Sequence, residues 1–224
     1  MTQKIFWSAP YQTELDTIIT AVEGDQVQVA QTIFFAFSGG QESDAGTLGG
    51  HPVLQAEKRE QDILYTLPPG HGLKAGDAVT LQIDWTRRYR LMRLHFAAEM
   101  VLQLVYQMRP GIERIGAHIA VDKARVDFAS QTSLAPLFPA IEAAARQLVA
   151  AGLPIVTAFS DEAAGRRYWE VAGFARMACG GTHPRTTAEV GTIRLKRKNT
   201  GRGKERIEIL LDAPELATGG NDRG

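Results

Sequence analysis

Residues 84–108 read DWTRRYRLMRLHFAAEMVLQLVYQM, and this stretch divides the chain into two unlike parts. From Arg87 to Met108 it contains neither glycine nor proline. Apolar residues recur along it every three or four positions, as on one face of an amphipathic helix. Arg109-Pro110-Gly111 supplies residues that end helices. The stretch therefore predicts one long helix that packs through an apolar stripe.

Before this helix the sequence predicts short β-strands. Residues 26–37 (QVQVAQTIFFAF), 53–67 and 78–84 (AVTLQID) are rich in β-branched and aromatic residues and are separated by turn residues. Residues 38–50 (SGGQESDAGTLGG) hold too many glycines for a strand and predict a loop with unusual backbone angles. We expect residues 1–86 to form a small β-barrel-like domain that carries the Gly-Gly-Gln loop.

After the helix the sequence predicts a mixture of strands and helices. In order, these are a hairpin over 116–128, a helix over about 133–151 that ends before Gly152, a short buried strand over 153–159, a short helix capped by Ser160, and a basic hairpin over 193–211. We expect an α+β fold in which residues 87–212 form a domain with an antiparallel sheet packed on helices. Residues 213–224 are polar and glycine-rich, which predicts a disordered tail.

The composition is that of a soluble globular protein, with 44% hydrophobic and 22% charged residues among 224. The single cysteine excludes a disulfide framework and favours a reducing compartment. No apolar run approaches the ~18 residues of a membrane-spanning helix. The first 15 residues lack the apolar core of a signal peptide. We therefore expect a cytoplasmic protein without membrane attachment.

Charge is divided between the two parts of the chain. Residues 1–86 hold 4 basic and 11 acidic residues, whereas residues 87–224 hold 21 and 14, so a neutral total conceals a basic C-terminal part. Such asymmetry indicates a polyanionic partner for the basic part, or chance clustering of surface charge.

His95 and Glu99 lie four residues apart and so share one face of the predicted helix. That face is apolar, where a carboxylate is costly unless a positive or hydrogen-bonding group meets it. A metal ion would supply that group. In the alternative interpretation, Glu99 reaches water at the edge of the stripe and His95 is a core histidine.

The only cysteine, Cys179, is followed by Gly180-Gly181-Thr182-His183. The glycines let the backbone fold back so that sulfur and imidazole can converge on one ion, and zinc accepts such mixed ligands. Alternatively, Cys179 is a small buried apolar residue. Taken together, the two pairs predict a Zn²⁺ site with four donors: His95, Glu99, Cys179 and His183.

The glycine-rich loop and the basic residues are further candidate sites. Backbone N–H groups of Gly39 and Gly40 can approach a ligand closely, although an ordinary hairpin loop would look similar. The basic residues can contact phosphates, or can form a solvated surface. The residues that we predict to contact a nucleic acid are Arg87, Arg88, Arg194, Lys196 and Lys198.

Together these segments resemble the alanyl-tRNA editing proteins, which are free-standing relatives of the editing domain of alanyl-tRNA synthetase. The matching positions run in the family's order over about residues 1–212. They are Thr32 to Phe35, Gly39-Gly40-Gln41, Asp44, Gly46, Gly76-Asp77, Val79, Asp84-Trp85, Arg87-Arg88, Met92, His95, Cys179 to His183, and Gly191. The combination of the three motifs GGQ, HxxxE and CGGTH is more specific than any one of them.

The resemblance implies a zinc-bearing α+β editing core behind a small β-barrel. His95, Cys179 and His183 match the family's zinc ligands, and Glu99 stands where the family has a second helix histidine. Glu99 is then a fourth ligand or a general base. Gln41 matches the loop glutamine near the substrate and is, with Glu99, a candidate catalytic residue. Thr32 matches the threonine implicated in recognising the seryl hydroxyl. The remaining loop residues implied in substrate binding are Gly39, Gly40 and Asp44.

We therefore expect a zinc-dependent trans-editing hydrolase that deacylates misacylated alanine tRNA, carrying serine or glycine. A catalytically silent tRNA-binding module, with a structural metal or none, is the second hypothesis. A metal-dependent hydrolase of small esters or amides is the third. No feature of the sequence indicates a protein partner.

Overall fold

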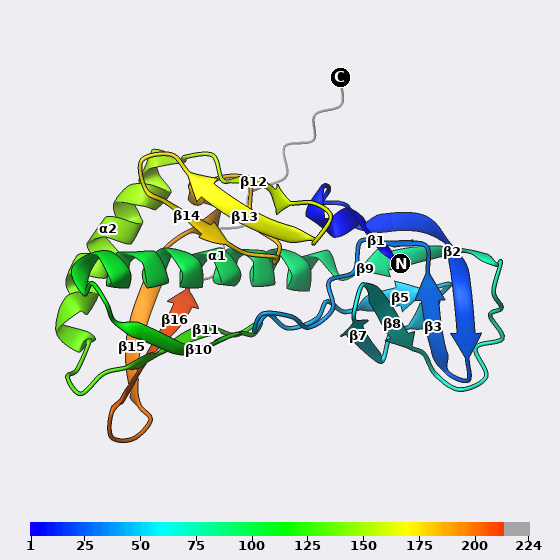
Figure 1. Cartoon of the computed structure of the whole chain (residues 1–224), viewed down its shortest axis with the longest axis horizontal. Helices are drawn as coiled ribbons and strands as arrows, with labels where there is room; N and C mark the ends of the chain where they lie inside the picture. Colours follow the sequence, from blue (N-terminus) through cyan, green and yellow to red (C-terminus); the bar gives the residue numbers. More distant parts are fainter. Residues whose placement is uncertain (213–224) are drawn as a thin grey trace.

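The computed structural model describes residues 1–212, which form an elongated molecule with two parts side by side (Figure 1). The N-terminal strands occupy one end, and the rest of the chain packs around the long helix α1 (Trp85–Met108). The predicted α+β class is confirmed: strands predominate, and two α-helices accompany them. The predicted tail, residues 213–224, lies outside the described part of the chain.

The N-terminal part is a curled antiparallel sheet of seven strands in the order β6-β5-β9-β2-β3-β8-β7. Its side chains enclose a core of their own, which includes Val27, Phe34 and Tyr65. The closed, barrel-like form of this sheet stays a prediction. Its strands are β2 (Glu14–Glu23), β3 (Gln26–Val29), β5 (Gly46–Leu48), β6 (His51–Pro52), β7 (Gln55–Arg59), β8 (Asp62–Thr66) and β9 (Ala78–Ile83), and β1 (Gln3–Lys4) pairs separately with β4 (Gln31–Thr32).

Most predicted strands of this part are present, but one is overestimated and several strands were missed. The loop expected over 38–50 is wrong in its second half, because Gly46 to Leu48 form β5 and pair with β9 in the sheet. Strands β1 and β6 were not predicted either. The strands expected over 53–67 and 78–84 are β7, β8 and β9. The strand expected over 26–37 is two short strands, β3 and β4, and nothing beyond Thr32 is a strand, because Ile33 to Ala36 run through the core as irregular buried chain. The longest strand, β2, was not predicted, because its polar and apolar residues alternate imperfectly.

Helix α1 confirms the predicted long helix, but it is buried on nearly all of its faces rather than on the single apolar face that we expected. It begins after Asp84, whose carboxylate accepts a hydrogen bond from the Arg87 N–H at 3.0 Å. Almost every side chain from Leu91 to Val105 is buried. The reason is that sheets cover the helix on two sides (Figure 1). Polar groups in the middle of α1 are therefore held in a dry environment.

One of these sheets has four antiparallel strands in the order β10-β11-β16-β15, and the other has three in the order β12-β13-β14. Helix α2 (Phe138–Ala151) ends at Gly152, which has the left-handed φ of 58° that favours glycine. It begins later than predicted, because a 3-10 turn precedes it. The strands are β10 (Glu113–Ile119), β11 (Ala124–Ala129), β12 (Val156–Asp161), β13 (Arg166–Val171), β14 (Ala175–Ala178), β15 (Ile193–Asn199) and β16 (Lys204–Leu211).

Both predicted hairpins are confirmed, as β10–β11 and β15–β16. A strand is present near residues 153–159, as expected, but the prediction that it is buried is wrong. This strand, β12, lies at the edge of its sheet, and Val156 and Phe159 are exposed. The helix expected after Ser160 is wrong as well, because that residue lies inside β12. Among the described residues, no helix is long and apolar enough to cross a membrane.

Candidate metal centre

Four metal-ligating side chains converge between α1 and the loop that follows β14. His95 and Glu99 lie one turn apart on α1, and Cys179 and His183 come from the loop. His95 Nε2 lies 3.3 Å from Cys179 Sγ and 3.3 Å from Glu99 Oε1. His183 Nε2 lies 2.9 Å from Glu99 Oε2. One donor atom from each residue lies within 4.8 Å of the others.

These residues fit a zinc ion. Donors held about 2.0–2.3 Å from a tetrahedral ion lie roughly 3.3–3.7 Å from one another, and two of the three distances above are in that range. Nδ1 of His183 is buried and has no hydrogen-bond partner among residues 1–212. Two imidazoles, a thiol and a carboxylate are a donor set that zinc accepts.

The electrostatics of the cluster favour the ligating forms of both acids. Burial by itself raises the pKa of Glu99, but the positive charge of the adjacent His95 and His183 imidazolium groups holds that pKa well below its usual range. Burial lowers the pKa values of both histidines, but the anions Glu99 and Cys179 raise them overall, so a bound ion would take the place of the imidazolium protons. Burial and Glu99 also act to raise the pKa of Cys179, yet the same two imidazoles lower it overall. The thiolate, which is the form that binds metals, is therefore stabilised at this position.

The second glycine of the CGGTH motif is required by the packing of His95. A Cβ atom on Gly181 would lie 2.2 Å from Cε1 of His95. At Gly180 a Cβ would meet nothing within 4 Å. The loop can thus approach α1 closely only where it passes Gly181, and this approach brings Cys179 and His183 to the helix ligands.

Gln41, from the glycine-rich loop, lies behind His95 and is fully buried. Its Oε1 lies 2.5 Å from Nδ1 of His95, and its Nε2 donates to Thr182 Oγ1 at 3.1 Å. Because an amide oxygen only accepts hydrogen bonds, Nδ1 carries the proton and Nε2 is free to bind the ion. These contacts give Gln41 a role in positioning His95, and the catalytic role expected for it beside the substrate stays a prediction.

The loop that carries Gln41 is held against β10. Gly39 and Gly40 have φ values of 61° and 88°, in the region that favours glycine. A Cβ on Gly40 would lie 2.7 Å from the carbonyl oxygen of Ala117. The Gly40 carbonyl accepts from the Ile119 N–H at 2.8 Å. Of the two glycines predicted to bind substrate, Gly39 borders the pocket described next and Gly40 does not.

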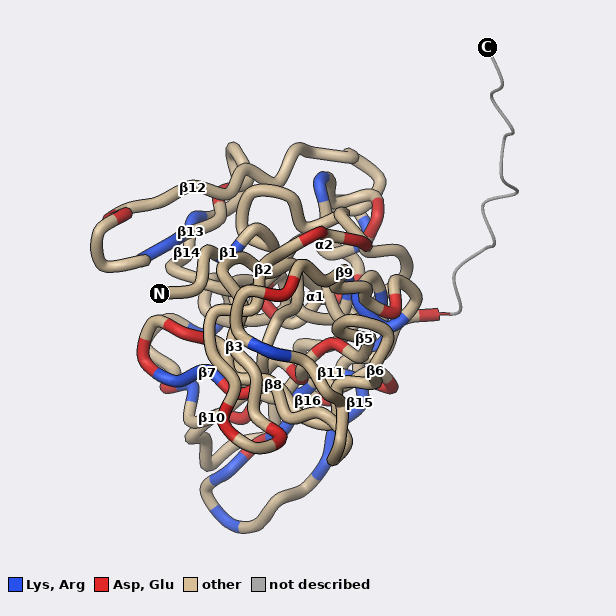
Figure 2. Tube along the Cα trace, turned by 90° about the vertical axis from the view of Figure 1, so that its right-hand side faces the viewer, with Lys and Arg blue, Asp and Glu red and all other residues tan. Residues whose placement is uncertain are grey.

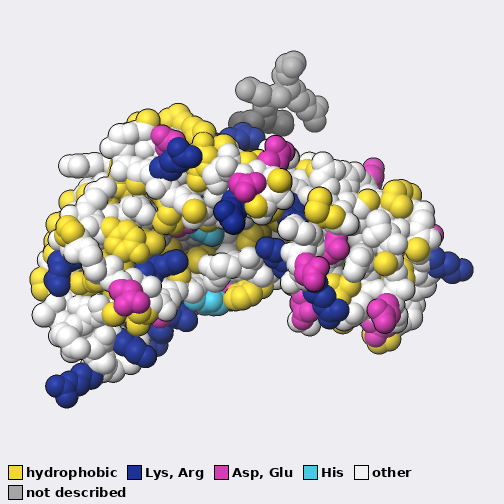
Figure 3. Space-filling model, in the orientation of Figure 1, with side chains coloured by type: hydrophobic (Ala, Val, Ile, Leu, Met, Phe, Trp, Pro, Cys, Tyr) yellow, Lys and Arg dark blue, Asp and Glu magenta, His cyan; other side chains and the backbone are white. Residues whose placement is uncertain are grey.

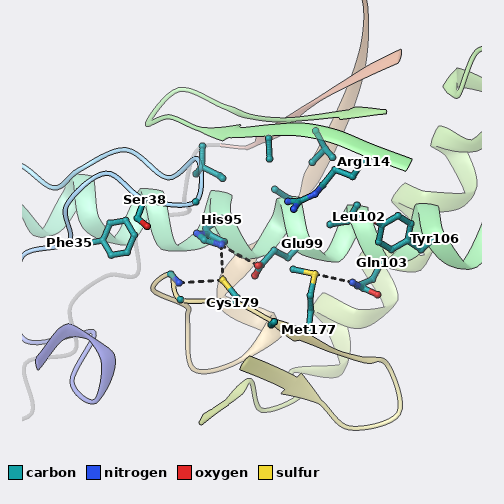
Figure 4. A pocket seen from close by; sticks show the side chains of 18 residues that line it. Phe35, Ser38, His95, Glu99, Leu102, Gln103, Tyr106, Arg114, Met177 and Cys179 are labelled. Carbon is teal, nitrogen blue, oxygen red and sulfur yellow. Dashed lines mark hydrogen bonds and ion pairs between the residues drawn. The ribbon is translucent and has the colours of Figure 1, made fainter. Parts of the chain in front are cut away.

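A pocket of about 440 Å³ opens beside the four ligands (Figure 4). His95, Glu99 and Cys179 form part of its wall. It extends from Phe35 at one end to Tyr106 and Arg114 at the other. In the space-filling view, histidine side chains are visible where this face is hollowed (Figure 3). The ligands are thus accessible to a small substrate although they are largely buried.

Thr32 does not line this pocket. Its side chain is fully buried, its hydroxyl lies 2.5 Å from the Tyr65 hydroxyl, and it accepts from the Phe34 N–H at 2.9 Å. Because the hydrogen bonds of Thr32 serve the N-terminal core, its placement lends no support to the expectation that it meets a seryl hydroxyl.

Asp44 and Arg88 form a buried ion pair between the loop and α1. Arg88 also donates to the carbonyls of Ile33 at 2.5 Å and Pro10 at 3.0 Å, and Asp44 accepts from the Phe35 N–H at 2.7 Å. Neither side chain exposes surface to a ligand. The predictions that Asp44 binds substrate and that Arg88 contacts tRNA are corrected accordingly: the pair joins the two parts of the molecule.

The other predicted tRNA contacts remain at the surface. Arg87 is paired with Glu42 at 2.8 Å and is one-quarter exposed, and Arg194 is paired with Asp212 at 2.7 Å. Lys196 and Lys198 are exposed on β15 and have no ion pair among the described residues. Basic residues follow the β15–β16 hairpin to its tip (Figure 2).

Several residues of the site were not found from the sequence. Gln103, Tyr106, Arg114 and Met177 line the pocket, and Trp7 donates from Nε1 to the Gly180 carbonyl at 2.9 Å. Only Gln103 and Tyr106 carried a usable signal, since they lie one and two turns beyond Glu99 on the same helix.

Comparison with known proteins identifies the family. The chain is 31% identical over 216 residues to the alanyl-tRNA editing protein AlaX-M of Pyrococcus horikoshii, a match that covers 95% of this chain and 99% of the relative. The chain belongs to the alanyl-tRNA editing protein family. The AlaX-M protein of Methanosarcina barkeri is 30% identical over 242 aligned positions, gaps included. The match covers 94% of this chain and 99% of the relative. The resemblance predicted from the motifs is thereby confirmed.

Alanine–tRNA ligases are also similar to this member of the family. The ligase of Methanococcus aeolicus is 28% identical over 229 aligned positions, gaps included. The match covers 92% of this chain but only 25% of the ligase. The matched region is thus a minor part of the synthetase and nearly the whole of this chain. No protein-family model matches the chain.

Proposed function

We propose that this chain deacylates misacylated alanine tRNA, carrying serine or glycine, at a zinc ion held by His95, Glu99, Cys179 and His183. The observation that carries the proposal is the convergence of these four donors, three of them in the wall of a pocket, in a chain whose relatives are named alanyl-tRNA editing proteins. The small-ester hydrolase hypothesis has the same metal chemistry but gives no role to the basic surface.

The reaction is hydrolysis of an ester. The oxygen of water bonds to the carbonyl carbon, the bond from that carbon to the ribose oxygen breaks, and a proton passes to the ribose oxygen. When bound, zinc supplies Lewis acidity that polarises a carbonyl or makes bound water more acidic. Gln41 keeps the proton of His95 on Nδ1, so that Nε2 faces the ion throughout.

We assign Glu99 as a fourth ligand rather than a general base. Its two oxygens face the two imidazoles, at 3.3 Å from His95 Nε2 and 2.9 Å from His183 Nε2. A general base would need one oxygen turned toward substrate water. Ser38 and Gln103 are polar side chains that line the pocket, and they replace Thr32 as the candidates that meet a seryl hydroxyl.

Recognition of tRNA is proposed for the exposed cations. Lys196 and Lys198 on β15, with Arg194 and Arg87, are placed to contact phosphates, because such contacts need exposed charge and no defined pocket. An enzyme that edits charged tRNA acts where tRNA is charged, which supports a cytoplasmic location.

The test is deacylation by the zinc-loaded protein of seryl-tRNA(Ala), with correctly charged alanyl-tRNA(Ala) as the comparison. We expect serine to be released and alanine to be largely spared, and we expect Cys179→Ala to lose both zinc and activity. Intact seryl-tRNA(Ala), in the presence of a protein that contains stoichiometric zinc and binds the tRNA, would support the binding-module hypothesis instead.

A further inference from the structure

A second cavity leads to the mouth of the zinc pocket. A groove of about 520 Å³ lies between the N-terminal segment and the β12–β13 hairpin. A small cavity of about 90 Å³ shares Lys4, Trp7 and Gly165 with this groove. The same small cavity shares Phe35, Ser38 and Gly180 with the zinc pocket. The three spaces therefore adjoin one another along the junction of the two parts of the molecule.

The groove and the small cavity are lined by cations. Lys4 and Lys58 border the small cavity, and Arg167 borders the groove. Burial is the largest cause that lowers the pKa of Lys4, and the nearby charge of Lys58 is the second. The two ammonium groups therefore repel each other across this space. The acidic residue in the groove wall is Glu162, and Asp62 is paired with the N-terminal amine at 3.3 Å.

Arg167 is a buried cation without a full set of partners. It is 6% exposed, and its Nε has no hydrogen-bond partner among residues 1–212. Its Nη2 donates to the Trp7 carbonyl oxygen at 2.8 Å. Since a buried guanidinium N–H is costly when unsatisfied, Arg167 offers a donor to an anion that enters the groove.

Aromatic rings stand beside these cations. Trp7 and Phe159 are in edge contact, with ring centroids 5.7 Å apart. The Arg167 guanidinium lies 5.5 Å from the Trp7 ring and 5.2 Å from the Phe159 ring, and Lys4 Nζ lies 5.2 Å from Trp7. Partly exposed rings within a cationic groove are the features by which proteins bind single-stranded nucleic acid, because bases stack on the rings and phosphates meet the cations.

We propose that this groove binds the unpaired 3′-terminal nucleotides of the tRNA, and that the aminoacyl ester enters the zinc pocket past Phe35 and Ser38. The inference rests on the proposed function and adds the route by which the substrate reaches the ligands. The β12–β13 hairpin, whose tip reaches over the N-terminal segment, forms one wall of the route (Figure 1). The other end of the pocket, at Tyr106 and Arg114, then receives no nucleotide.

The first test measures binding without catalysis. A fluorescent single-stranded RNA that ends in CCA is titrated with zinc-loaded protein, and its anisotropy is followed. We expect Trp7→Ala and Lys58→Gln each to raise the dissociation constant about fivefold or more, which is the lower range for loss of one stacked base. Lys74→Gln, which removes an exposed charge from the connection between β8 and β9 that borders neither cavity, is the matched control. Because Trp7 also contacts Gly180, zinc content and circular dichroism are measured for each variant, and Lys58→Gln carries the test if Trp7→Ala misfolds.

The second test separates this inference from the proposed function. Wild type and Lys58→Gln are compared on seryl-tRNA(Ala) and on seryl-adenosine, which lacks the preceding nucleotides. We expect the variant to lose several-fold more kcat/KM on the tRNA than on the adenosine ester. A wild type that hydrolyses neither substrate overturns the proposed function, whereas the RNA titration still tests the groove. Undiminished RNA binding by Lys58→Gln and Trp7→Ala, or weakened binding by Arg114→Gln, overturns the inference.

Discussion

Oε1 of Gln41 lies 2.5 Å from Nδ1 of His95, so a residue of the N-terminal loop determines which ring nitrogen of a helix residue carries the proton. The two residues are 54 positions apart in the sequence. The loop is kept there by its backbone hydrogen bonds to β10. Orientation of the metal ligand therefore depends on contacts outside the ligand set itself.

Replacing Gln41 tests that dependence. Gln41→Leu removes the acceptor for the His95 proton, and we expect zinc affinity to fall about 10- to 100-fold. The affinity is measured by competition with a chelator of known strength. Gln103→Leu is the control, because Gln103 lines the same pocket but hydrogen-bonds Met177 rather than a ligand. Equal zinc affinity in both variants would contradict a positioning role for Gln41.

Substitutions of Glu99 distinguish a ligand from a general base. If Glu99 binds zinc, Glu99→Gln should lower the zinc content at equilibrium, because a neutral amide is a poorer ligand than a carboxylate. Glu99→His should retain the metal, because an imidazole at the same helix position can also bind it. Zinc content is measured by elemental analysis after dialysis. A Glu99→Gln protein with full zinc but no deacylation would show that Glu99 acts as a base.

The close approach of Gly181 to His95 predicts a large effect of one methyl group. In Gly181→Ala the new Cβ would lie 2.2 Å from Cε1 of His95, so the imidazole or the loop must move. We expect loss of zinc affinity and of activity together. Gly180→Ala should keep the zinc affinity of wild type, since its Cβ meets nothing within 4 Å. Similar zinc affinities for the two variants would contradict this geometry.

The Asp44–Arg88 pair should contribute to stability rather than to substrate binding. Asp44→Asn leaves the Arg88 charge buried and without its partner, and we expect a loss of about 3–5 kcal/mol in the free energy of unfolding. Urea denaturation monitored by circular dichroism measures it. Glu42→Gln, which breaks the partly exposed pair with Arg87, should cost at most about 1 kcal/mol. A stable Asp44→Asn protein that has lost only substrate affinity would restore Asp44 to the site.

Neutralising the β15 lysines should weaken tRNA binding in a salt-dependent manner. For Lys196→Gln combined with Lys198→Gln, we expect lower affinity and a shallower dependence on salt, by a little under one unit of logarithmic slope per lost phosphate contact. Filter binding of uncharged tRNA at several salt concentrations measures both. The double variant Lys74→Gln, Arg146→Gln removes the same charge from other exposed positions. If it has the same effect, the contacts are not localised to β15.

The sequence was informative where chemistry is local. Periodicity located α1, and the spacing of His95 and Glu99 put them on one face of it. The glycines of CGGTH indicated a loop that can fold toward a helix, and Gly181 shows why one of them is needed. Each of these features depends on neighbours within a few residues, which is the range over which patterns predict structure.

Burial and pairing over long range could not be predicted in this way. Thr32, Asp44 and Arg88 match the family's motifs, but their partners lie 33 or 44 residues away, and the pairing removes all three side chains from solvent. The wall of the pocket is likewise assembled by tertiary packing of α1 against β10 and β14, which no spacing in the sequence encodes.

The buried position of Gln41 has a consequence for any attempt to shorten this protein. A fragment of residues 87–212 would retain all four candidate metal ligands and the buried apolar residues that pack around α1. It would nevertheless lack the amide that selects the ring nitrogen of His95, and one end of the cavity would lose its wall. Truncation at the predicted domain boundary thus keeps all four candidate ligands but removes part of the structure that orients them, so the ligands alone do not show where this protein can be shortened.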